Sequence, residues 1–326
     1  MQNPSPRPLR FACLLTIIST MATAALGQVP SSTWVQLTPA HNPQRRGAPA
    51  MVYDPVSQKI VMFGGYGRVS YYGDTWTFDG TDWKRHRVTV APSPRAAAAM
   101  AFDVTLQKLV LFGGWNGQNY LGDTWVWDGA TSSWTQMSPA KSPKPMTGPM
   151  VFTDPRNGRV DTYGGFDGRF YSLTTYRWRD GSWHKLFPAQ SPSARGSAVF
   201  ATDPVRKQTV LFGGLADVNP INTWTYDGRT WTQQFPNNQL PYRFFSGAVY
   251  DPRFQGVVVF GGFSDSDVND TWLWDGTDWL QLSPASSPAV RESFGMAFDE
   301  VHQQTIIYGG QSGRSLLRDT WVLQTN

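Results

Sequence analysis

The stretch Ile60-Val61-Met62-Phe63-Gly64-Gly65, followed nine residues later by Asp74-Thr75-Trp76, decides the fold of this chain. A second copy reads Leu109-Val110-Leu111-Phe112-Gly113-Gly114, with Asp123-Thr124-Trp125 after it. The glycine pair recurs at Gly164-Gly165, Gly213-Gly214, Gly261-Gly262 and Gly309-Gly310, so successive copies lie 49, 51, 49, 48 and 48 residues apart. A fixed period near 50 residues is typical of a repeat protein built from one supersecondary unit.

Each copy predicts four short strands. In the first copy we expect them at residues 48–53, 60–63 and 75–78 and from Trp83 onward. Asp54-Pro55 and Asp79-Gly80 favour turns between them, and the glycine pair ends the second strand. One antiparallel sheet of this size cannot bury both of its faces, so the copies must stack, and radial stacking gives a β-propeller.

The order of these features resembles the kelch repeat: a double glycine after the second strand, an aromatic residue in the third and a tryptophan in the fourth. The resemblance covers Gln28 to the end of the chain and implies an all-β, six-bladed kelch-type β-propeller with four antiparallel strands per blade. Six copies of about 49 residues account for nearly all of residues 28–326, so we expect no second domain.

The two ends of the repeat region predict how the ring closes. The last copy stops after Thr320-Trp321-Val322-Leu323 and has no fourth strand. Residues 34–40, before the first copy, match fourth strands such as residues 279–285. We therefore expect the N-terminal strand to complete the last blade, which removes an open sheet edge.

Residues 1–27 are predicted to form a secretory signal peptide. Arg7 and Arg10 precede an apolar run over residues 11–26, and Ala25-Leu26-Gly27 offers small residues for cleavage. The run is too short and too rich in Ser and Thr for a membrane span. We expect a secreted, periplasmic or cell-surface protein. Cys13, the only cysteine, lies in this segment, so the mature chain has no disulfide.

The charge of the chain excludes two classes of partner. The formal charge falls from +4 to +2 when the two arginines of the leader are removed. The chain has no run of Lys and Arg, so we expect neither nucleic acid nor an anionic membrane as a partner. We also expect a monomer that uses no cofactor.

Fourteen of the fifteen tryptophans occupy repeated strand positions and are predicted to pack between blades. Trp115 instead follows a glycine pair, in a loop. The equivalent positions hold Tyr66, Phe166, Leu215, Phe263 and Gln311. The kelch resemblance implies that these loops open at the mouth of the central channel, where proteins of the family bind partners. The alternative is that these aromatic side chains only cover the glycines.

An arginine recurs eight residues before the turn aspartate, at Arg46, Arg95, Arg195, Arg243 and Arg291, whereas the third copy has Met146. The resemblance implies that these arginines begin the innermost strands at the mouth. Each could pair with the aspartate that opens the third strand of its copy, or could meet a ligand. The third copy has lost both members, as Met146 and Thr174, which favours the ion pair. In the fourth copy Asn222 replaces the aspartate, so Arg195 is expected to be free for a ligand.

These observations predict a binding site shared by three adjacent blades, the second to the fourth. Arg195 would hold an anionic or hydroxyl-rich group against Trp115 and the loop that contains Phe166, Arg169 and Tyr171. The remaining candidate ligand-binding residues around the mouth are Tyr66, Phe263, Arg243 and Arg291.

A metal site is not expected. Asp265, Asp267 and Asp270 resemble part of a calcium loop, but the turn glycine and the closing glutamate are missing. The four histidines, at positions 41, 86, 184 and 302, occupy unrelated places in the repeat.

Three functions remain open. The first is a non-enzymatic module that binds a glycan or a protein at the channel mouth. The second is a cofactor-free mutarotase or epimerase similar to the periplasmic sialic-acid mutarotases, with Glu292 as the candidate acid or base. The third is a structural component of a cell-surface assembly. Copper oxidases of this fold need a tyrosine crosslinked to cysteine, and the mature chain has no cysteine.

Overall fold

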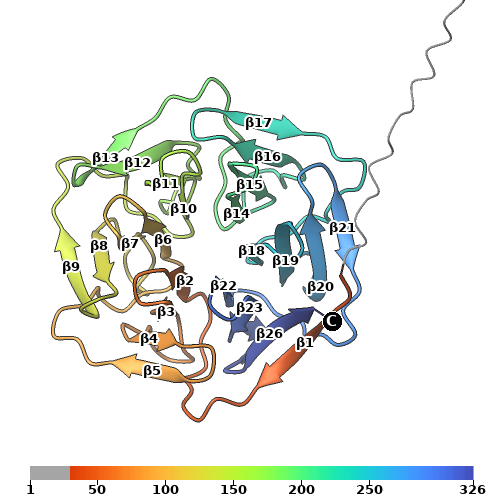
Figure 1. Ribbon diagram of the computed structural model, residues 1–326. Helices are drawn as coiled ribbons and strands as arrows, with labels where there is room; N and C mark the ends of the chain where they lie inside the picture. Colours follow the sequence, from red (N-terminus) through yellow and green to blue (C-terminus); the bar gives the residue numbers. More distant parts are fainter. Residues whose placement is uncertain (1–29, 326) are drawn as a thin grey trace, which may run out of the picture.

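The computed structural model describes residues 30–325, so the predicted signal peptide lies outside the described residues. Six four-stranded antiparallel sheets are arranged radially around a central axis (Figure 1), and their innermost strands line a channel along it. This confirms the predicted six-bladed propeller. No helix that could cross a membrane occurs among the described residues.

In each blade the first strand named below is the innermost, next to the channel, and the last strand lies at the outer rim. Blade 1 contains β2 (Ala50–Asp54), β3 (Lys59–Phe63), β4 (Thr75–Phe78) and β5 (Trp83–His86). Blade 2 contains β6 (Ala99–Asp103), β7 (Lys108–Phe112), β8 (Thr124–Asp128) and β9 (Ser133–Met137). Blade 3 contains β10 (Met150–Thr153), β11 (Val160–Tyr163), β12 (Thr175–Arg179) and β13 (Ser182–Lys185). Blade 4 contains β14 (Val199–Asp203), β15 (Gln208–Phe212), β16 (Thr223–Tyr226) and β17 (Trp231–Gln234).

The last two blades differ slightly from the others. Blade 5 contains β18 (Gly247–Asp251), β19 (Gly256–Phe263), β20 (Asp267–Trp274) and β21 (Trp279–Leu282), with an irregular register between Phe260 and Gly262. Blade 6 contains β22 (Gly295–Asp299), β23 (Gln304–Tyr308), β26 (Thr320–Thr325) and β1 (Ser32–Leu37). It also carries a small hairpin made of β24 (Gln311–Ser312) and β25 (Ser315–Leu316).

The N-terminal strand closes the ring as predicted. β1 pairs antiparallel with β26, with Trp34 opposite Leu323. The two ends of the described chain therefore lie in one blade (Figure 1). This pairing covers the edge that β26 would otherwise expose.

The threonine of the Asp-Thr-Trp motif joins neighbouring blades. In every blade the tryptophan of the outermost strand is at most 4% exposed. Its indole Nε1 donates a hydrogen bond of 2.9–3.3 Å to the motif threonine of the preceding blade, for example from Trp134 to Thr75. Because this bond satisfies the indole N–H, the large ring can be buried without leaving a polar atom unpaired.

The aspartate and the tryptophan of the same motif hold the repeat arginine. The buried guanidinium of Arg95 binds both carboxylate oxygens of Asp123, at 2.6 and 2.8 Å, and Trp125 Nε1 donates to the same carboxylate. The same arrangement confirms the predicted ion pairs of Arg46, Arg243 and Arg291 with Asp74, Asp270 and Asp319, respectively.

A closed ring of six backbone hydrogen bonds surrounds the channel near its mouth. Each of six equivalent residues donates its N–H to the carbonyl of the equivalent residue in the preceding blade, at 2.6–3.2 Å; they are residues 48, 97, 148, 197, 245 and 293. All six have a positive φ, between 48° and 59°. For the five that are not glycine this conformation costs about 1–2 kcal/mol each, which the shared hydrogen bonds offset.

The ring of residues 48, 97, 148, 197, 245 and 293 lies between two cavities. Ala48, Ala97, Ser197, Phe245 and Ser293 line both a pocket at the mouth and a larger cavity of about 1040 Å³ inside the channel. The innermost strands supply the apolar walls of that larger cavity, including Val52, Phe102 and Phe200. The ring therefore forms the floor of the mouth pocket.

Candidate functional site

Each blade presents one pair of residues at the channel mouth. The residue after the glycine pair forms an isolated antiparallel bridge with the residue that follows the repeat-arginine position. The pairs are Gly47 with Tyr66, Ala96 with Trp115, Thr147 with Phe166, Gly196 with Leu215, Phe244 with Phe263, and Glu292 with Gln311. The first four pairs combine a small residue with a large one, which leaves room beside the large side chain.

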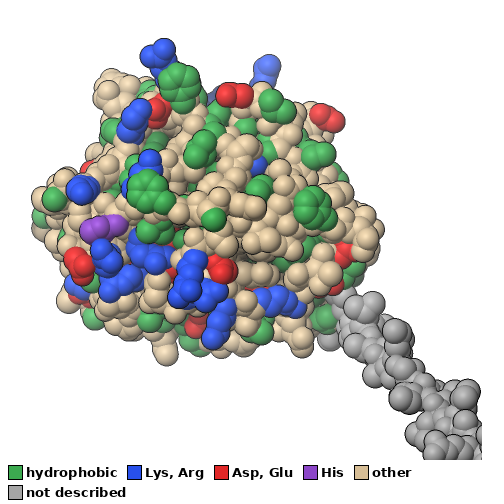
Figure 2. Space-filling view, turned by 90° about the horizontal axis from the view of Figure 1, so that it is seen from above, with side chains coloured by type: hydrophobic (Ala, Val, Ile, Leu, Met, Phe, Trp, Pro, Cys, Tyr) green, Lys and Arg blue, Asp and Glu red, His purple; other side chains and the backbone are tan. Residues whose placement is uncertain are grey.

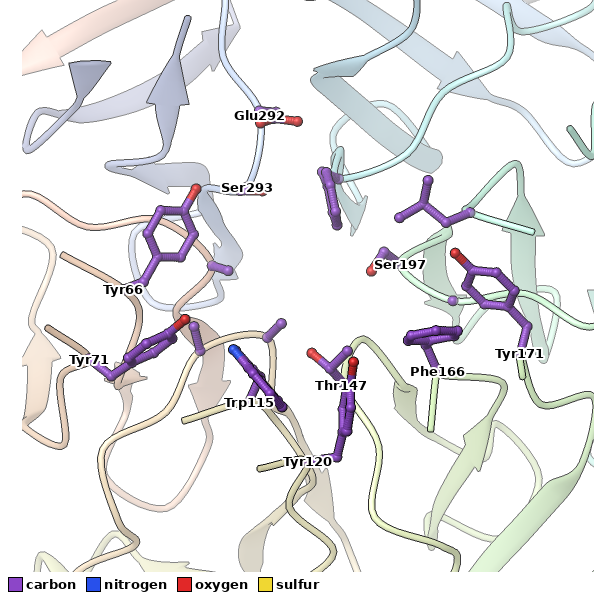
Figure 3. Close-up of a pocket in the computed structure, with 16 residues that line it drawn as sticks. Tyr66, Tyr71, Trp115, Tyr120, Thr147, Phe166, Tyr171, Ser197, Glu292 and Ser293 are labelled. Atoms are coloured by element: carbon purple, nitrogen blue, oxygen red, sulfur yellow. The ribbon is translucent and has the colours of Figure 1, made fainter. Parts of the chain in front are cut away.

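These pairs surround the mouth pocket, which has a volume of about 360 Å³ (Figure 3). Two aromatic side chains from each of the first three blades form a continuous wall, which we call the aromatic arc. It consists of Tyr66 and Tyr71, Trp115 and Tyr120, and Phe166 and Tyr171. Thr147, Ser197 and Ser293 also line the pocket with their hydroxyl groups, and Ser197 and Ser293 belong to the ring that forms its floor.

Contacts between rings hold most of the aromatic arc together. The ring centroids of Trp115 and Tyr120 are 4.5 Å apart, and those of Phe166 and Tyr171 are 4.9 Å apart. Tyr120 also meets Phe166 of the next blade edge to face, at 5.9 Å. These are the distances at which aromatic pairs attract one another. The arc is therefore built before any ligand arrives.

Glycines in the neighbouring loops make room for two of the tyrosines. A Cβ added at Gly117 would lie 2.7 Å from the ring of Tyr71, and one added at Gly168 would lie 2.5 Å from the ring of Tyr120. Both glycines also have a positive φ, near 97°. Each tyrosine therefore packs on the loop of the following blade, and a side chain at the glycine would displace it.

Blades 5 and 6 give the opposite side of the pocket a different character. In blade 5, Phe244 and Phe263 stack on each other, with centroids 5.3 Å apart, and only the neighbouring Phe245 lines the pocket. In blade 6 the pair is polar. Gln311 accepts a hydrogen bond of 2.7 Å from the Tyr66 hydroxyl, which links this side to the aromatic arc.

Glu292 contributes the charge of the pocket. Its side chain is half-buried and lies at the upper rim in Figure 3, across the mouth from Trp115 and Tyr120. Burial, together with the nearby charge of Asp267, raises the pKa of Glu292 to about 7. Burial and the charge of Glu292 also raise the pKa of Tyr66 to about 12, so this tyrosine is neutral at physiological pH.

The structure places the predicted arginines away from the pocket. Arg195 is fully buried, and its guanidinium donates to the Gly213 carbonyl, the Ser193 hydroxyl and the Asn222 side chain at 2.8–3.1 Å. Arg243 and Arg291 are equally buried and bind their aspartates. The expectation that Arg195 is free for a ligand therefore finds no support in its surroundings.

The loop residues of the predicted site separate into two groups. Tyr66, Trp115, Phe166 and Tyr171 line the pocket, whereas Phe263 and Arg169 do not. The Arg169 guanidinium lies over the ring of Phe170, 4.9 Å from its centroid. The predicted binding half covered blades 2 to 4, but the aromatic arc covers blades 1 to 3.

The sequence interpretation missed Tyr71 and Tyr120. Both lie five residues after the aromatic that follows the glycine pair, as Tyr171 does. Five residues after the same position, blades 4 to 6 hold Pro220, Val268 and Leu316, and the residue that pairs with Phe263 in blade 5 is Asp267. This tyrosine, repeated in three consecutive copies only, is the signal that could have located the arc.

The aspartates of the suspected calcium loop have other partners. Asp270 binds Arg243, and Asp267 accepts a hydrogen bond from the Gly313 backbone at 2.6 Å. Within residues 30–325, no three His, Cys, Asp or Glu side chains are grouped so that they could hold a metal ion.

The fold and the mouth pocket define a six-bladed propeller whose loops meet around one cavity. The family model described as the KLHDC2/KLHL20/DRC7 Kelch-repeats domain matches residues 23–214, more than half of the chain. The chain therefore belongs to the kelch-repeat family, and this membership indicates a protein-binding module in general terms. No curated protein matches the sequence.

Proposed function

We propose that this protein is a secreted binding module that holds a glycan in the mouth pocket. The observation that carries the proposal is the aromatic arc: six rings from three consecutive blades facing one cavity. A sugar ring has an apolar face that packs on aromatic side chains and hydroxyl groups that need polar partners. The pocket offers both, since the hydroxyls of Thr147, Ser197 and Ser293 lie next to the rings.

The size and stiffness of the pocket suit a small ligand group. Its volume of about 360 Å³ lies at the lower end of the range for small-molecule sites, which is roughly 300–1,000 Å³. The hydrogen-bonded ring fixes the floor, and ring contacts fix most of the wall. A preformed site loses little conformational entropy on binding, which increases affinity.

A glycan array probed with the mature protein tests this proposal. We expect saturable binding to a subset of glycans, reduced by Tyr120→Ala because the central ring of the arc is lost. A soluble form of the same glycan should compete with the immobilised form. Capture of proteins with no response to any glycan would show that the pocket serves a protein ligand instead.

The second candidate function, a sugar mutarotase, is favoured by one observation. Glu292 borders the pocket with a pKa of about 7, which suits a group that must both give and accept a proton near neutral pH. Exchange of anomers by NMR would test it: acceleration by the wild type that Glu292→Gln abolishes would support an enzyme. Binding without acceleration would leave the binding module.

A further inference from the structure

The charged side chain that lines the mouth pocket is acidic. Among the residues of the described chain that line it, Glu292 is the one charged side chain, and no lysine or arginine is present. Figure 2 shows that Lys and Arg side chains are plentiful elsewhere and gather on one part of the outer surface. The pocket is therefore suited to a cationic ligand more than to the anionic group expected from the repeat arginines.

The arginine closest in sequence to Glu292 does not neutralise this charge. Arg291 precedes Glu292, but its guanidinium is bound by Asp319 and by the Gly309 carbonyl. Within residues 30–325, the Glu292 carboxylate accepts no hydrogen bond from the protein, although the backbone of this residue is bound to Gln311. A half-buried carboxylate without a partner favours a ligand that supplies a positive charge.

The aromatic arc adds to the same preference. The face of an aromatic ring is negative and attracts a cation that lies within about 6 Å of the ring centroid. Trp and Tyr, which attract cations well, make up five of the six residues of the arc. Rings on one side and a carboxylate on the other can together bind an ammonium group that has lost most of its water.

We propose that the mouth pocket takes an amino sugar, a sugar ring that carries a free ammonium group. This inference rests on the proposed function and specifies the ligand class of the same pocket. The Glu292 carboxylate binds the ammonium group, while the sugar ring packs against Trp115 and Tyr120. The N-acetylated form of the same sugar is neutral, so it keeps the ring contacts and loses the charge contacts.

The test is isothermal titration calorimetry at pH 7.5 with three β-1,4-linked oligosaccharides of equal length, built from glucosamine, N-acetylglucosamine or glucose. We expect the glucosamine oligomer to bind at least about tenfold more tightly than the other two, as a charge-assisted hydrogen bond requires. Glu292→Gln should bring the affinity of the glucosamine oligomer down to that of the other two oligomers.

Glu300→Gln is the matched control, since it makes the same chemical change at the far end of the channel, where Glu300 lines the larger cavity. An equal loss of affinity in Glu300→Gln would mean that the cation is attracted by the overall charge, which overturns the proposal.

Two further outcomes separate this inference from the proposed function. Equal affinity for all three oligomers would overturn the amino-sugar proposal and leave the glycan-binding module intact. Failure of every oligosaccharide, with binding of a trimethyl-lysine peptide instead, would overturn both, because the aromatic arc would then serve a protein side chain.

Discussion

Replacing Asn222 by aspartate is expected to stabilise the protein. Blade 4 keeps the repeat arginine but has Asn222 where four other blades have an aspartate. One atom of the amide, Oδ1, accepts from Arg195 at 3.1 Å. The amide nitrogen cannot accept a second bond. The Nε1 atom of Trp224 is consequently buried without a partner, whereas Trp76, Trp125, Trp272 and Trp321 all donate to the aspartate.

The expected gain follows from these contacts. Burial lowers the pKa of Arg195 to about 10, the direction expected when desolvation disfavours a buried cation. A charge-assisted hydrogen bond contributes about 1.5–3 kcal/mol, and a partner for the orphan indole N–H about 1–3 kcal/mol. Partial burial of the new carboxylate offsets some of this. We therefore expect Asn222→Asp to raise the free energy of unfolding by roughly 1–3 kcal/mol.

The assay is thermal and denaturant unfolding of the mature protein. For a chain of this length, a gain of this size corresponds to a rise in Tm of roughly 2–5 °C. Asp123→Asn, which gives blade 2 the arrangement of blade 4, is the matched control and should lower stability by a similar amount. If Asn222→Asp leaves the Tm unchanged or lowers it while Asp123→Asn is harmless, the reasoning about these ion pairs is refuted.

Trp34→Ala should cost about 3–5 kcal/mol of unfolding free energy, measured in urea, because the ring is buried in the closing blade; a loss below 1 kcal/mol would contradict closure by β1. Burial raises the pKa of the four paired carboxyls, but arginine hydrogen bonds and charge outweigh it and leave the pKa values below normal. Their stabilisation is present above the unfolded pKa and lost as pH falls below about 4, so the difference in Tm between wild type and Asp123→Asn should shrink between pH 6 and 3. Mass spectrometry of exported protein should find an N-terminus near Gln28, and an intact Met1 would refute the signal peptide.

The sequence was sufficient to predict the fold because the same pattern of strands and turns occurs in six copies. The residues of each Asp-Thr-Trp motif have three complementary contacts. The aspartate binds the repeat arginine, the threonine accepts a hydrogen bond from a tryptophan of the next blade, and the tryptophan of the motif donates to the aspartate. The closure of the ring could also be predicted from the sequence, since residues 34–40 match the fourth strand that the last copy lacks.

The candidate site could be predicted only in part. The aromatics after the glycine pair recur, and three of the four line the pocket. The sequence shows that Arg195 lacks an aspartate partner, and we therefore expected it to be free for a ligand. It does not show that the Gly213 carbonyl and the Ser193 hydroxyl also bind this arginine. The closed ring of hydrogen bonds depends on six positive φ angles, and alanine or serine gives no sequence signal for that conformation.

The central claim is that ligands bind to the aromatic arc, and one pair of substitutions tests it most directly. Trp115 and Phe263 follow the glycine pair in blades 2 and 5, but Trp115 lines the pocket and Phe263 does not. Calorimetry should compare Trp115→Ala and Phe263→Ala with the wild type, using the glycan that binds best on the array. We expect Trp115→Ala to weaken binding by about thirtyfold, the loss of about 2 kcal/mol typical of a central aromatic contact, and Phe263→Ala to leave binding unchanged. Equal affinities of the wild type and Trp115→Ala would contradict the claim.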